Sequence, residues 1–485
     1  MTTIAFPTPD PEILARRDAI WADLAKLVSA DGLITSEDER RAFETDALAA
    51  YRQVPLAVVL PSSTEEVAAV LSYCNREGIK VIPRGAGTSL AGGAIPQPDA
   101  VVIGVSRMRR VIDIDYANRT ARVEAGITNL AISDAVTADG FFYAPDPSSQ
   151  LACTIAGNIA MNSGGAHCLK YGVTTNNLMG VRLVLMDGTV VDIGGDHLDA
   201  AGYDILGLLT GSEGQLGIVT EATVRILPLA EGARPLLIGF DSSETAGACV
   251  TAIISAGIIP VALEFMDGPA IRICEDFARA GYPIEAEAML IIEVEGSEAE
   301  IADELAKIEA IARMFNPLTL KVSQSSSESA AIWKGRKSAF GAMGRIADYL
   351  CMDGTIPTGQ LSLVLRRIAE ICAENGVGVA NIFHAGDGNL HPLILYNAAK
   401  PGDLERAELA GAEVLKLCVD VGGCLTGEHG VGIEKRDLMT YQYTRTDLEQ
   451  QMRARAVFDP RWLLNPAKVF PLENRLMPQD NVSSG

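Results

Sequence analysis

Two histidines flank a short glycine-rich sequence in the segment Ile382–Pro392. Asp387-Gly388, between them, is typical of a two-residue hairpin turn, because both central residues of a type I′ turn need a positive φ. With that turn, His384 is expected to pair with His391, so that the two side chains lie about 5 Å apart at Cβ on one face of the hairpin. Two converging imidazoles are suited to a single divalent metal ion.

A third ligand for such an ion is available in the glycine-rich stretch 427–432, which carries Glu428 beside His429. The chain has five histidines, and three of them lie in these two short segments. An alternative is that His384 and His391 form a satisfied cross-strand pair and that His429 caps a helix. Three imidazoles and a carboxylate together in glycine-rich loops favour the metal site over that purely structural role.

The composition places these segments in a large globular protein. The chain has 485 residues, of which 48% are hydrophobic and 21% charged, which predicts two or three domains with ample core. The net charge of −22 disfavours nucleic acid or an anionic membrane as a direct partner. Nine cysteines occur without a Cys-x-x-Cys pair, so neither an iron–sulfur cluster nor a zinc ribbon is expected in this chain.

The sequence also bears on location. It contains no run of about 18 apolar residues and no apolar segment at its start. We therefore expect neither a membrane span nor a signal peptide. A cytoplasmic protein with reduced thiols follows from this interpretation.

Three loops rich in Gly, Ser, Thr and Asn recur among the predicted strands, at residues 84–93, 145–165 and 211–219. The first has neither the residue order of a nucleoside-triphosphate loop nor a complete GxGxxG fingerprint. Its backbone N–H groups can form an anion nest, with hydroxyl donors from Thr88 and Ser89, and a diphosphate is the natural guest of such a nest. Backbone groups from several loops suit a large, flat cofactor with many hydrogen bonds.

The rest of the chain alternates between strand-like and helical patterns. Four strands separated by three helices are predicted within residues 235–322, and we expect these helices on one side of an antiparallel sheet. A long amphipathic helix is predicted near 433–458. Residues 1–50 are predicted to be mainly helical and to form a scaffold extension without chemistry.

Five segments, in this order, resemble the FAD-linked oxidases with a p-cresol methylhydroxylase-type flavin domain: 83–90, 158–165, 211–217, 384–391 and 427–432. The ordered set of five is far more specific than any one motif, and the resemblance covers roughly residues 50–472. Within this family the sequence is most similar to the FAD-linked subunit of bacterial glycolate oxidase. Cytochrome-type D-lactate dehydrogenase and D-2-hydroxyglutarate dehydrogenase are near relatives.

The resemblance implies an α+β fold in four parts. An N-terminal helical extension (1–51) precedes an FAD-binding domain of two subdomains (52–228). A cap or substrate domain with an antiparallel sheet (229–425) includes the metal hairpin. A C-terminal helical segment (426–485) returns to the flavin.

The resemblance also assigns residues to FAD. Its pyrophosphate would contact Arg84, Gly85, Ala86, Gly87, Thr88 and Ser89. Its flavin side would contact Thr154, Gly157, Asn158, Ser163, Gly164, Gly214 and Ile218, with Asn465 and Lys468 from the C-terminal segment. The first loop has no histidine, the residue that tethers the flavin in some relatives, so non-covalent FAD is expected. His167 and Cys168, near the flavin segment, are interpreted as ordinary loop residues.

Arg336 precedes Lys337 on a helix predicted at 332–340. The family match makes Arg336 the clamp for a substrate carboxylate, which its planar guanidinium suits; a solvated basic turn is the alternative. D-2-hydroxyglutarate dehydrogenases carry a further lysine in the strand that matches Tyr349–Asp353, and this sequence has none there. The missing second cation favours a small monocarboxylate, glycolate or D-lactate, and leaves D-2-hydroxyglutarate as the alternative substrate.

The sequence-based hypothesis is FAD-dependent oxidation of a small D-2-hydroxy acid to the 2-oxo acid. A divalent metal, Zn²⁺, would be held by His384, His391 and Glu428 with open positions for the substrate. His429 would accept the hydroxyl proton while hydride passes from C2 to flavin N5. Onward electrons would go to a separate iron–sulfur subunit, quinone or cytochrome, in a homodimer or a heteromeric complex peripheral at the membrane.

Two other classes of protein remain open at this point. A metal-dependent hydrolase would use the same two histidines and glutamate with a general-base histidine, but it would not need three flavin-type loops. A non-catalytic flavin-binding subunit would keep the loops and have no reason for His384, His391 and Glu428.

Overall fold

Short apolar strands form the first sheet of the N-terminal domain. The computed structural model describes residues 4–197 and 202–472. Helix α4 (Thr64–Glu77) links two strands that are both parallel to a third; Ser63 caps its first turn, and Gly78, at φ +73°, ends it. The strand order is β1-β2-β4-β3, with β1 (Leu33–Ile34), β2 (Ala57–Val59), β3 (Lys80–Arg84) and β4 (Ala100–Gly104).

A second, antiparallel sheet completes this domain, as the two-subdomain prediction requires. Its order is β5-β6-β10-β8-β9, with β5 (Val111–Asp115), β6 (Thr120–Glu124), β8 (Leu178–Val184), β9 (Val190–Gly194) and β10 (Ile218–Arg225). Strands β7 (Phe141–Phe142) and β11 (Leu227–Pro228) pair separately. The helices are α5 (Asn129–Thr137), α6 (Ile155–Met161), α7 (Cys168–Tyr171), α8 (Thr174–Asn177) and α9 (Ile205–Leu209). Strands β8 and β9 pair with each other as an antiparallel hairpin.

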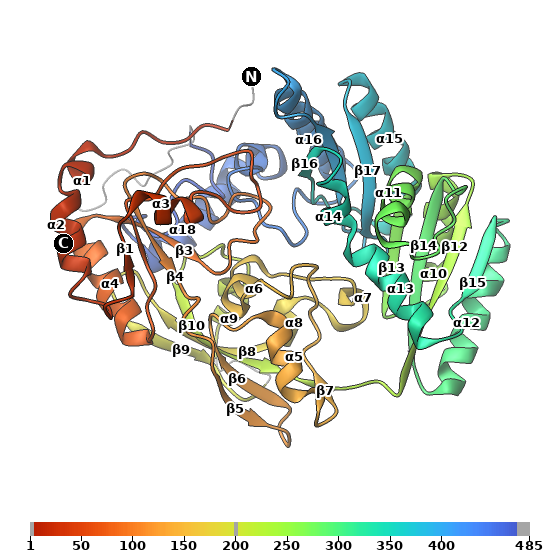
Figure 1. Cartoon of the computed structure of the whole chain (residues 1–485), viewed down its shortest axis with the longest axis horizontal. Helices are drawn as coiled ribbons and strands as arrows, with labels where there is room; N and C mark the ends of the chain where they lie inside the picture. Colours follow the sequence, from red (N-terminus) through yellow and green to blue (C-terminus); the bar gives the residue numbers. More distant parts are fainter. Residues whose placement is uncertain (1–3, 198–201, 473–485) are drawn as a thin grey trace.

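The cap domain is built on a seven-stranded sheet in which each pair of neighbours is antiparallel. Its order is β15-β12-β14-β13-β17-β18-β16. The strands are β12 (Gly232–Phe240), β13 (Ala262–Asp267), β14 (Ala288–Gly296), β15 (Thr319–Val322), β16 (Asp348–Cys351), β17 (Gly378–His384) and β18 (Pro392–Tyr396). Figure 1 shows this sheet beside the N-terminal domain.

Helices cover both faces of the cap sheet, so the prediction of helices on one side is wrong. Strand β14 is apolar on both faces: Leu290 and Ile292 join one buried cluster, and Met289 and Ile291 join another. A sheet with two apolar faces must be covered twice. One layer is α10 (Ser243–Ser255), α12 (Glu298–Arg313), α15 (Leu361–Glu374) and α16 (Asp403–Asp420); the other is α11 (Gly268–Ala278), α13 (Ser326–Lys337) and α14 (Ala339–Met343).

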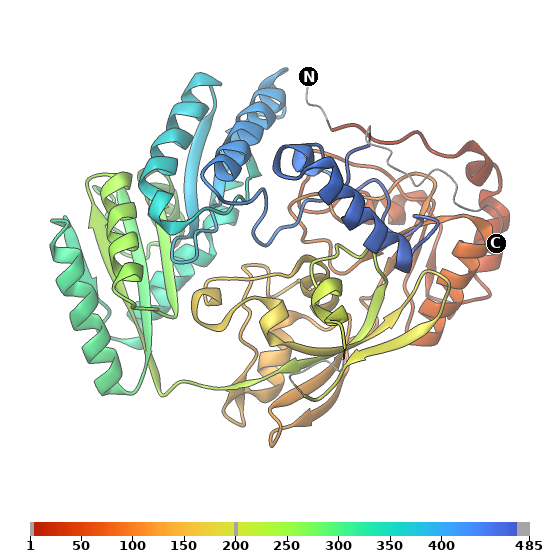
Figure 2. The same ribbon diagram turned by 180° about the vertical axis from the view of Figure 1, so that it is seen from behind.

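The predicted helix at 433–458 is interrupted, because the chain leaves helical geometry at Tyr443 (φ −115°, ψ 140°). Thr444 then opens α18 (Arg445–Phe458) with a capping box formed with Asp447. Shorter turns precede it: η3 (Arg436–Leu438) and α17 (Met439–Gln442). Helix α18 leads back to the N-terminal domain, where Leu464 forms a bridge to Val81 of β3 (Figure 2).

The N-terminal segment contains short helices, as predicted, but they make up less than half of its described residues, and the segment also supplies β1 to the first sheet. Its short helices are α1 (Pro11–Ala15), α2 (Arg17–Leu24), α3 (Glu37–Arg40) and η1 (Arg41–Phe43); a further 3-10 turn, η2 (Thr358–Gln360), precedes α15. The end of the predicted C-terminal segment, residues 473–485, lies outside the described residues. Within the described part of the chain, no helix combines the length and apolar character needed to cross a bilayer.

Candidate active site

One cavity of about 700 Å³ joins the glycine-rich loops of the N-terminal domain to the histidines of the cap. Its lining includes most of the residues that the sequence assigns to FAD: Arg84 to Ser89, Thr154, Gly157, Asn158, Ser163, Gly214, Ile218 and Asn465. It also includes His384, His391, Glu428 and His429. The loops and the imidazoles, far apart in sequence, therefore face one common space.

Glycine is required in the first loop because side chains would fill the space beside it. A Cβ on Gly85 would collide with the Thr154 hydroxyl, and one on Gly87, at φ +75°, with the guanidinium of Arg84. No side chain therefore covers the backbone where the sequence predicts a diphosphate, and the loop can accommodate such a group. Residues 45–47 of the N-terminal segment also line the cavity, and Arg84 donates to the carbonyl of Thr45 at 2.8 Å. The segment predicted to be without chemistry therefore shapes the cofactor end of the cavity.

Two predicted flavin contacts, Gly164 and Lys468, are not among the described residues that line the cavity. The Gly164 N–H donates to Glu428 Oε2 at 2.8 Å, and a Cβ at this position would lie 2.8 Å from the same oxygen. Gly164 thus connects the flavin-type segment to the predicted metal ligand. Lys468 is buried, and burial lowers the pKa of its ammonium to about 7 despite the nearby carboxylates of Asp46 and Glu213.

The histidine hairpin forms, but the predicted register is wrong by two residues. His384 bridges to Asn389 instead of His391, and the chain between them makes a four-residue turn with Gly388 at φ +78°. Because side chains alternate along a strand, a shift of two residues keeps both imidazoles on the same face. Their ring centroids lie 5.2 Å apart, so the predicted convergence is confirmed on a diagonal pair.

Three predicted metal ligands meet at one point. The Nε2 atoms of His384 and His391 lie 3.3 and 3.4 Å from Glu428 Oε1. The buried Nε2 of His391 has no hydrogen-bond partner, as expected of an atom reserved for an ion. Burial alone would lower the pKa of His384, but Glu264 and Glu428 raise it well above its ordinary value. The donor set and its negative field therefore fit a divalent cation.

Glu264 fixes which nitrogen of His384 faces that point. It lies opposite His384 in the β13–β17 pairing and accepts from Nδ1 at 2.7 Å, which leaves Nε2 as the ligand atom. Arg336, the predicted substrate clamp, donates to the same buried carboxylate at 2.8 Å. Among the described residues, the cavity lining includes Lys337 but not Arg336. The contacts of Arg336 thus place it behind a metal ligand.

His429 stacks on His391, with ring centroids 4.7 Å apart and planes 12° from parallel. Burial lowers the pKa of His429 to about 4, since the repulsion from His391 and Lys435 adds to it and the attraction of Asp353 only partly opposes it. A neutral imidazole at the cavity wall has the protonation state of a general base.

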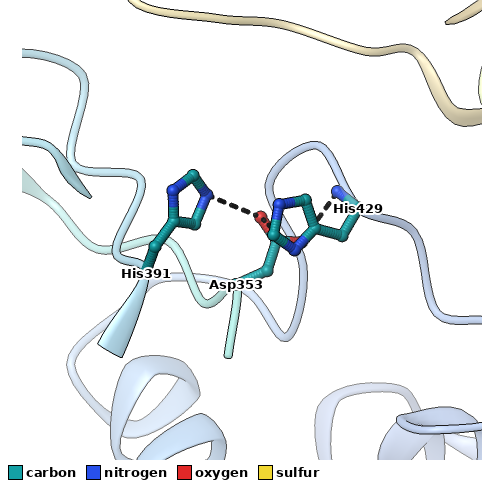
Figure 3. A group of neighbouring side chains, drawn as sticks. All are labelled: Asp353, His391 and His429. Carbon is teal, nitrogen blue, oxygen red and sulfur yellow. Dashed lines mark hydrogen bonds and ion pairs between the residues drawn. The ribbon is translucent and has the colours of Figure 1, made fainter. Parts of the chain in front are cut away.

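A second group of possible ligands, Asp353 with His391 and His429, shares His391 with the first (Figure 3). Asp353 already accepts from three backbone N–H groups and from Lys435. A carboxylate with its lone pairs used in this way is a poor ligand. His384, His391 and Glu428 are therefore the candidate ligand set.

Glu264, Asp353 and Glu213 were not singled out from the sequence, although each touches the backbone or a side chain of this site. One signal was available: Glu264 interrupts an otherwise apolar strand, Val261–Met266, and a charge in a buried strand needs a partner. Asp353 and Glu213 bind main-chain groups of distant segments, and no sequence pattern records such contacts.

His167, interpreted from sequence as an ordinary loop residue, instead bridges the two domains. Its Nδ1 lies 3.0 Å from Asp146 of the N-terminal domain and its Nε2 3.4 Å from Glu293 of β14. Trp333 donates to the same Glu293 at 2.8 Å. Burial alone would lower the pKa of His167, but the two carboxylates outweigh it and raise this pKa to about 10.

This bridge makes interdomain stability depend on pH. The folded-state pKa of His167 lies above the ordinary value of about 6.5, so its stabilisation is complete below that pH and is lost as the pH rises through about 10. His167→Phe keeps an aromatic ring beside Trp333 and removes the charge. We expect the difference in Tm between wild type and this variant to be largest near pH 6 and to disappear by about pH 10. Calorimetry at several pH values measures this difference. A Tm difference that does not change with pH would contradict the ion-pair role of His167.

Comparisons with known proteins cover nearly the whole chain. Residues 55–194 match the family described as FAD binding domain, and residues 230–469 match FAD linked oxidases, C-terminal domain. The chain is 46% identical to the glycolate oxidase subunit GlcD of Escherichia coli (strain K12) over 460 residues, which are 95% of this chain and 92% of that protein. It is 33% identical to a D-lactate dehydrogenase of Archaeoglobus fulgidus, over 93% of this chain and 99% of that protein.

Solved structures with low sequence identity share the fold. A 4-ethylphenol oxidase from Gulosibacter chungangensis superimposes with a TM-score of 0.81 at 16% identity, over 96% of this chain and 99% of that one. p-Cresol methylhydroxylase gives a TM-score of 0.79 at 15% identity, over 96% and 98%. The predicted α+β architecture, with its p-cresol methylhydroxylase-type domain, is confirmed.

Proposed function

The chain belongs to the FAD-linked oxidases, a flavoenzyme family that acts on CH–OH groups, and from that premise we propose that it oxidises a small D-2-hydroxy acid, glycolate or D-lactate, with the help of a divalent metal. The observation that carries the proposal is the single cavity, in which flavin-type loops and the ligand set His384, His391 and Glu428 face the same space. A hydrolase has no use for the loops, and a non-catalytic flavin subunit has no use for the ligand set.

The residues of the site would divide the chemistry as follows. FAD, held by the loops around Arg84, Thr154 and Gly214, would supply the acceptor for the hydride from C2. Zn²⁺, held by His384, His391 and Glu428, would supply Lewis acidity at the substrate hydroxyl. His429 would take the hydroxyl proton, because burial keeps its imidazole neutral.

Arg336 would clamp the substrate carboxylate only if it left Glu264, to which it donates at 2.8 Å; in its present contacts it would support His384 through that carboxylate. Strand β16 (Asp348–Cys351) carries no lysine, which supports a monocarboxylate over a dicarboxylate. Tyr349 from this strand and Phe340 line the same cavity as the ligand set, and their rings limit the size of a substrate there.

Reduced flavin needs an electron acceptor. We propose a separate subunit or a quinone or cytochrome in that role, since the nine cysteines of the chain form no Cys-x-x-Cys motif and the two relatives named above are a glycolate oxidase subunit and a dehydrogenase. A heteromeric assembly is the arrangement that the name of the subunit relative supports, and we propose that partner subunits place it at the membrane periphery.

Anaerobic flavin bleaching tests the proposed substrate class. The purified protein is mixed with glycolate, D-lactate, L-lactate or D-2-hydroxyglutarate, and the flavin absorbance is followed by stopped flow. We expect fast bleaching with glycolate or D-lactate and bleaching at least about tenfold slower with L-lactate and D-2-hydroxyglutarate. A substrate that leaves a polar group of the site unpaired loses more than about 1.4 kcal/mol of transition-state binding, which corresponds to a rate at least tenfold lower. Fastest bleaching with D-2-hydroxyglutarate would select the alternative substrate, and no bleaching by any 2-hydroxy acid would reject the class.

A further inference from the structure

The loop 427–432, which carries Glu428 and His429, has no helix or strand of its own. Such a loop leaves its main-chain N–H groups without ladder partners, and buried N–H groups need acceptors. Five of these N–H groups have carboxylate acceptors: those of residues 427, 428, 429, 431 and 432. Two buried side chains, from different domains, provide these carboxylate oxygens; the Gly427 N–H also donates to the main-chain carbonyl of Asp353 at 2.8 Å.

Asp353, at the end of β16 in the cap domain, binds the first half of the loop. Its Oδ2 accepts from the N–H groups of Gly427 and His429, each at 3.0 Å, and its Oδ1 accepts from the N–H of Glu428 at 3.1 Å. The Thr426 hydroxyl donates to the same carboxylate. In Figure 3 the carboxylate of Asp353 lies between the imidazole of His391 and the backbone N–H of His429, with a dashed line to each.

Asp353 is fully buried, and a buried carboxylate needs a charged or hydrogen-bonded partner. The Lys435 ammonium, also fully buried, donates to Oδ2 at 3.2 Å and to the carbonyl of Gly430 at 2.9 Å. An ion pair of this kind needs all of its hydrogen bonds to offset desolvation, and the loop supplies most of them.

Glu213, in the third glycine-rich loop of the N-terminal domain, binds the second half. Its Oε1 accepts from the N–H of Val431 at 2.6 Å and its Oε2 from the N–H of Gly432 at 2.8 Å. Its own backbone is in the left-handed region, at φ 54°, and its carbonyl accepts from Asn465 at 2.6 Å. Glu213 lines the cavity beside Gly214, so it links the flavin-type loop to the loop of Glu428 and His429.

We propose that Asp353 and Glu213 are positioning residues that hold the loop 427–432 between the two domains and thereby set the place of Glu428 and His429 relative to the cofactor. Neither carboxylate is in the ligand set, and neither has a sequence motif that assigns it a role. The effect on metal affinity and turnover rests on the proposed function; the restraint of the loop itself does not.

The arrangement explains how a metal ligand on a loop is held accurately. The side chain of Glu428 accepts from Gly164 of the N-terminal domain at 2.8 Å and from Asn389 of the cap at 3.3 Å. Its main chain is bound by Asp353. Groups from both domains thus contact one ligand, and a small displacement of the loop changes the ligand geometry, to which metal sites are sensitive.

Hydrogen exchange and metal affinity together test the proposal in the full-length holoprotein. Asp353→Asn replaces an acceptor oxygen by an amide NH₂, and Glu213→Gln does the same in the other half. We expect faster amide exchange at 428–429 in Asp353→Asn and at 431–432 in Glu213→Gln, whereas the Gly427 N–H keeps the main-chain carbonyl of residue 353 as an acceptor. We also expect Zn²⁺ affinity, measured by competition with a chromophoric chelator, to fall about tenfold or more in Asp353→Asn, the scale for losing a residue that supports a metal ligand.

Asp99→Asn is a matched control. Asp99 is a buried carboxylate that accepts from a backbone N–H (Asp10, 2.7 Å) and from a lysine (Lys80, 2.7 Å), in the first sheet of the N-terminal domain. This variant is expected to lose stability without a change in loop exchange or Zn²⁺ affinity. If Asp353→Asn does not fold, amide exchange at 431–432 in Glu213→Gln decides whether the positioning role holds.

The outcomes separate this inference from the proposed function. Amide exchange at 427–432 that is as slow in both variants as in the wild type would overturn the positioning role, whatever the activity of the variants. Faster exchange together with unchanged Zn²⁺ affinity would overturn the link between loop and metal site. A wild-type protein that bleaches with no 2-hydroxy acid would reject the proposed function and leave the exchange result valid.

Discussion

His429→Ala is expected to slow anaerobic flavin reduction by about 10²–10⁴-fold, the usual contribution of a general base, while FAD stays bound. His429 lines the cavity beside the ligand set, and burial lowers its pKa to about 4, so the side chain is ready to accept a proton. Its ring stacks on His391 at 4.7 Å, which fixes its plane. Alanine removes the acceptor and leaves the flavin-type loops untouched.

The measurement is a stopped-flow trace of flavin bleaching with saturating substrate, together with the flavin absorbance per chain. His197→Ala is a suitable control, because His197 is exposed on the N-terminal domain and lies outside the cavity lining. A loss in kcat with little change in KM is expected, since proton acceptance stabilises the transition state and not the bound substrate. Turnover at the wild-type rate in His429→Ala would show that another group takes the proton.

The histidine hairpin shows which part of a site can be predicted from sequence. Asp387-Gly388 identified the turn region, and the alternation of side chains placed His384 and His391 on one face. The register was wrong because Ala385 and Gly386 belong to the turn: the N–H groups of both donate to Leu263 of the neighbouring strand β13. The residue types of a turn do not reveal a tertiary contact of this kind. The prediction that both imidazoles lie on one face held because the register was shifted by an even number of residues.

The cap sheet shows the same limit at the level of the fold. Each strand and helix between residues 235 and 322 was predictable from its apolar pattern. Their layering was not, since Met289 and Leu290, neighbours on β14, enter different buried clusters. A continuous apolar run indicates burial on both faces, and that signal in β14 favoured two helix layers over the single layer predicted.

The supporting carboxylates were beyond sequence reasoning for a physical reason. Glu264, Asp353 and Glu213 act on His384 and on main-chain groups that lie far along the chain. The histidines stand out in the sequence because the chain has only five of them, and the glycine-rich loops stand out because their glycines are close together in the sequence. The role of a buried carboxylate is recognisable only from its partners, and folding brings those partners together.

Removing the metal is the second change with a large expected effect. If His384, His391 and Glu428 hold an ion that polarises the substrate hydroxyl, its loss removes several kcal/mol of transition-state stabilisation, on the order of 10³-fold in rate. Exhaustive chelation should therefore stop bleaching by substrate and leave the flavin spectrum intact. Added Zn²⁺ should restore the rate, and a series with Mn²⁺ and Co²⁺ identifies the preferred ion.

Glu428→Gln gives the matched genetic test, because the amide keeps the size of the side chain and its bond to Gly164 while the charge is lost. The negative field matters here: the two histidines of the site hold the pKa of Glu428 at about 2 although burial opposes them. We expect weaker Zn²⁺ binding and a large loss of rate in this variant, with no further loss on chelation, since the ligand and the ion act as one unit. Glu295→Gln, at the domain interface beside Lys170, is the control. Full activity after exhaustive chelation would remove the metal from the mechanism and would leave His384 as an ion-pair partner of Glu264 and Glu428, beside the stacked rings of His391 and His429.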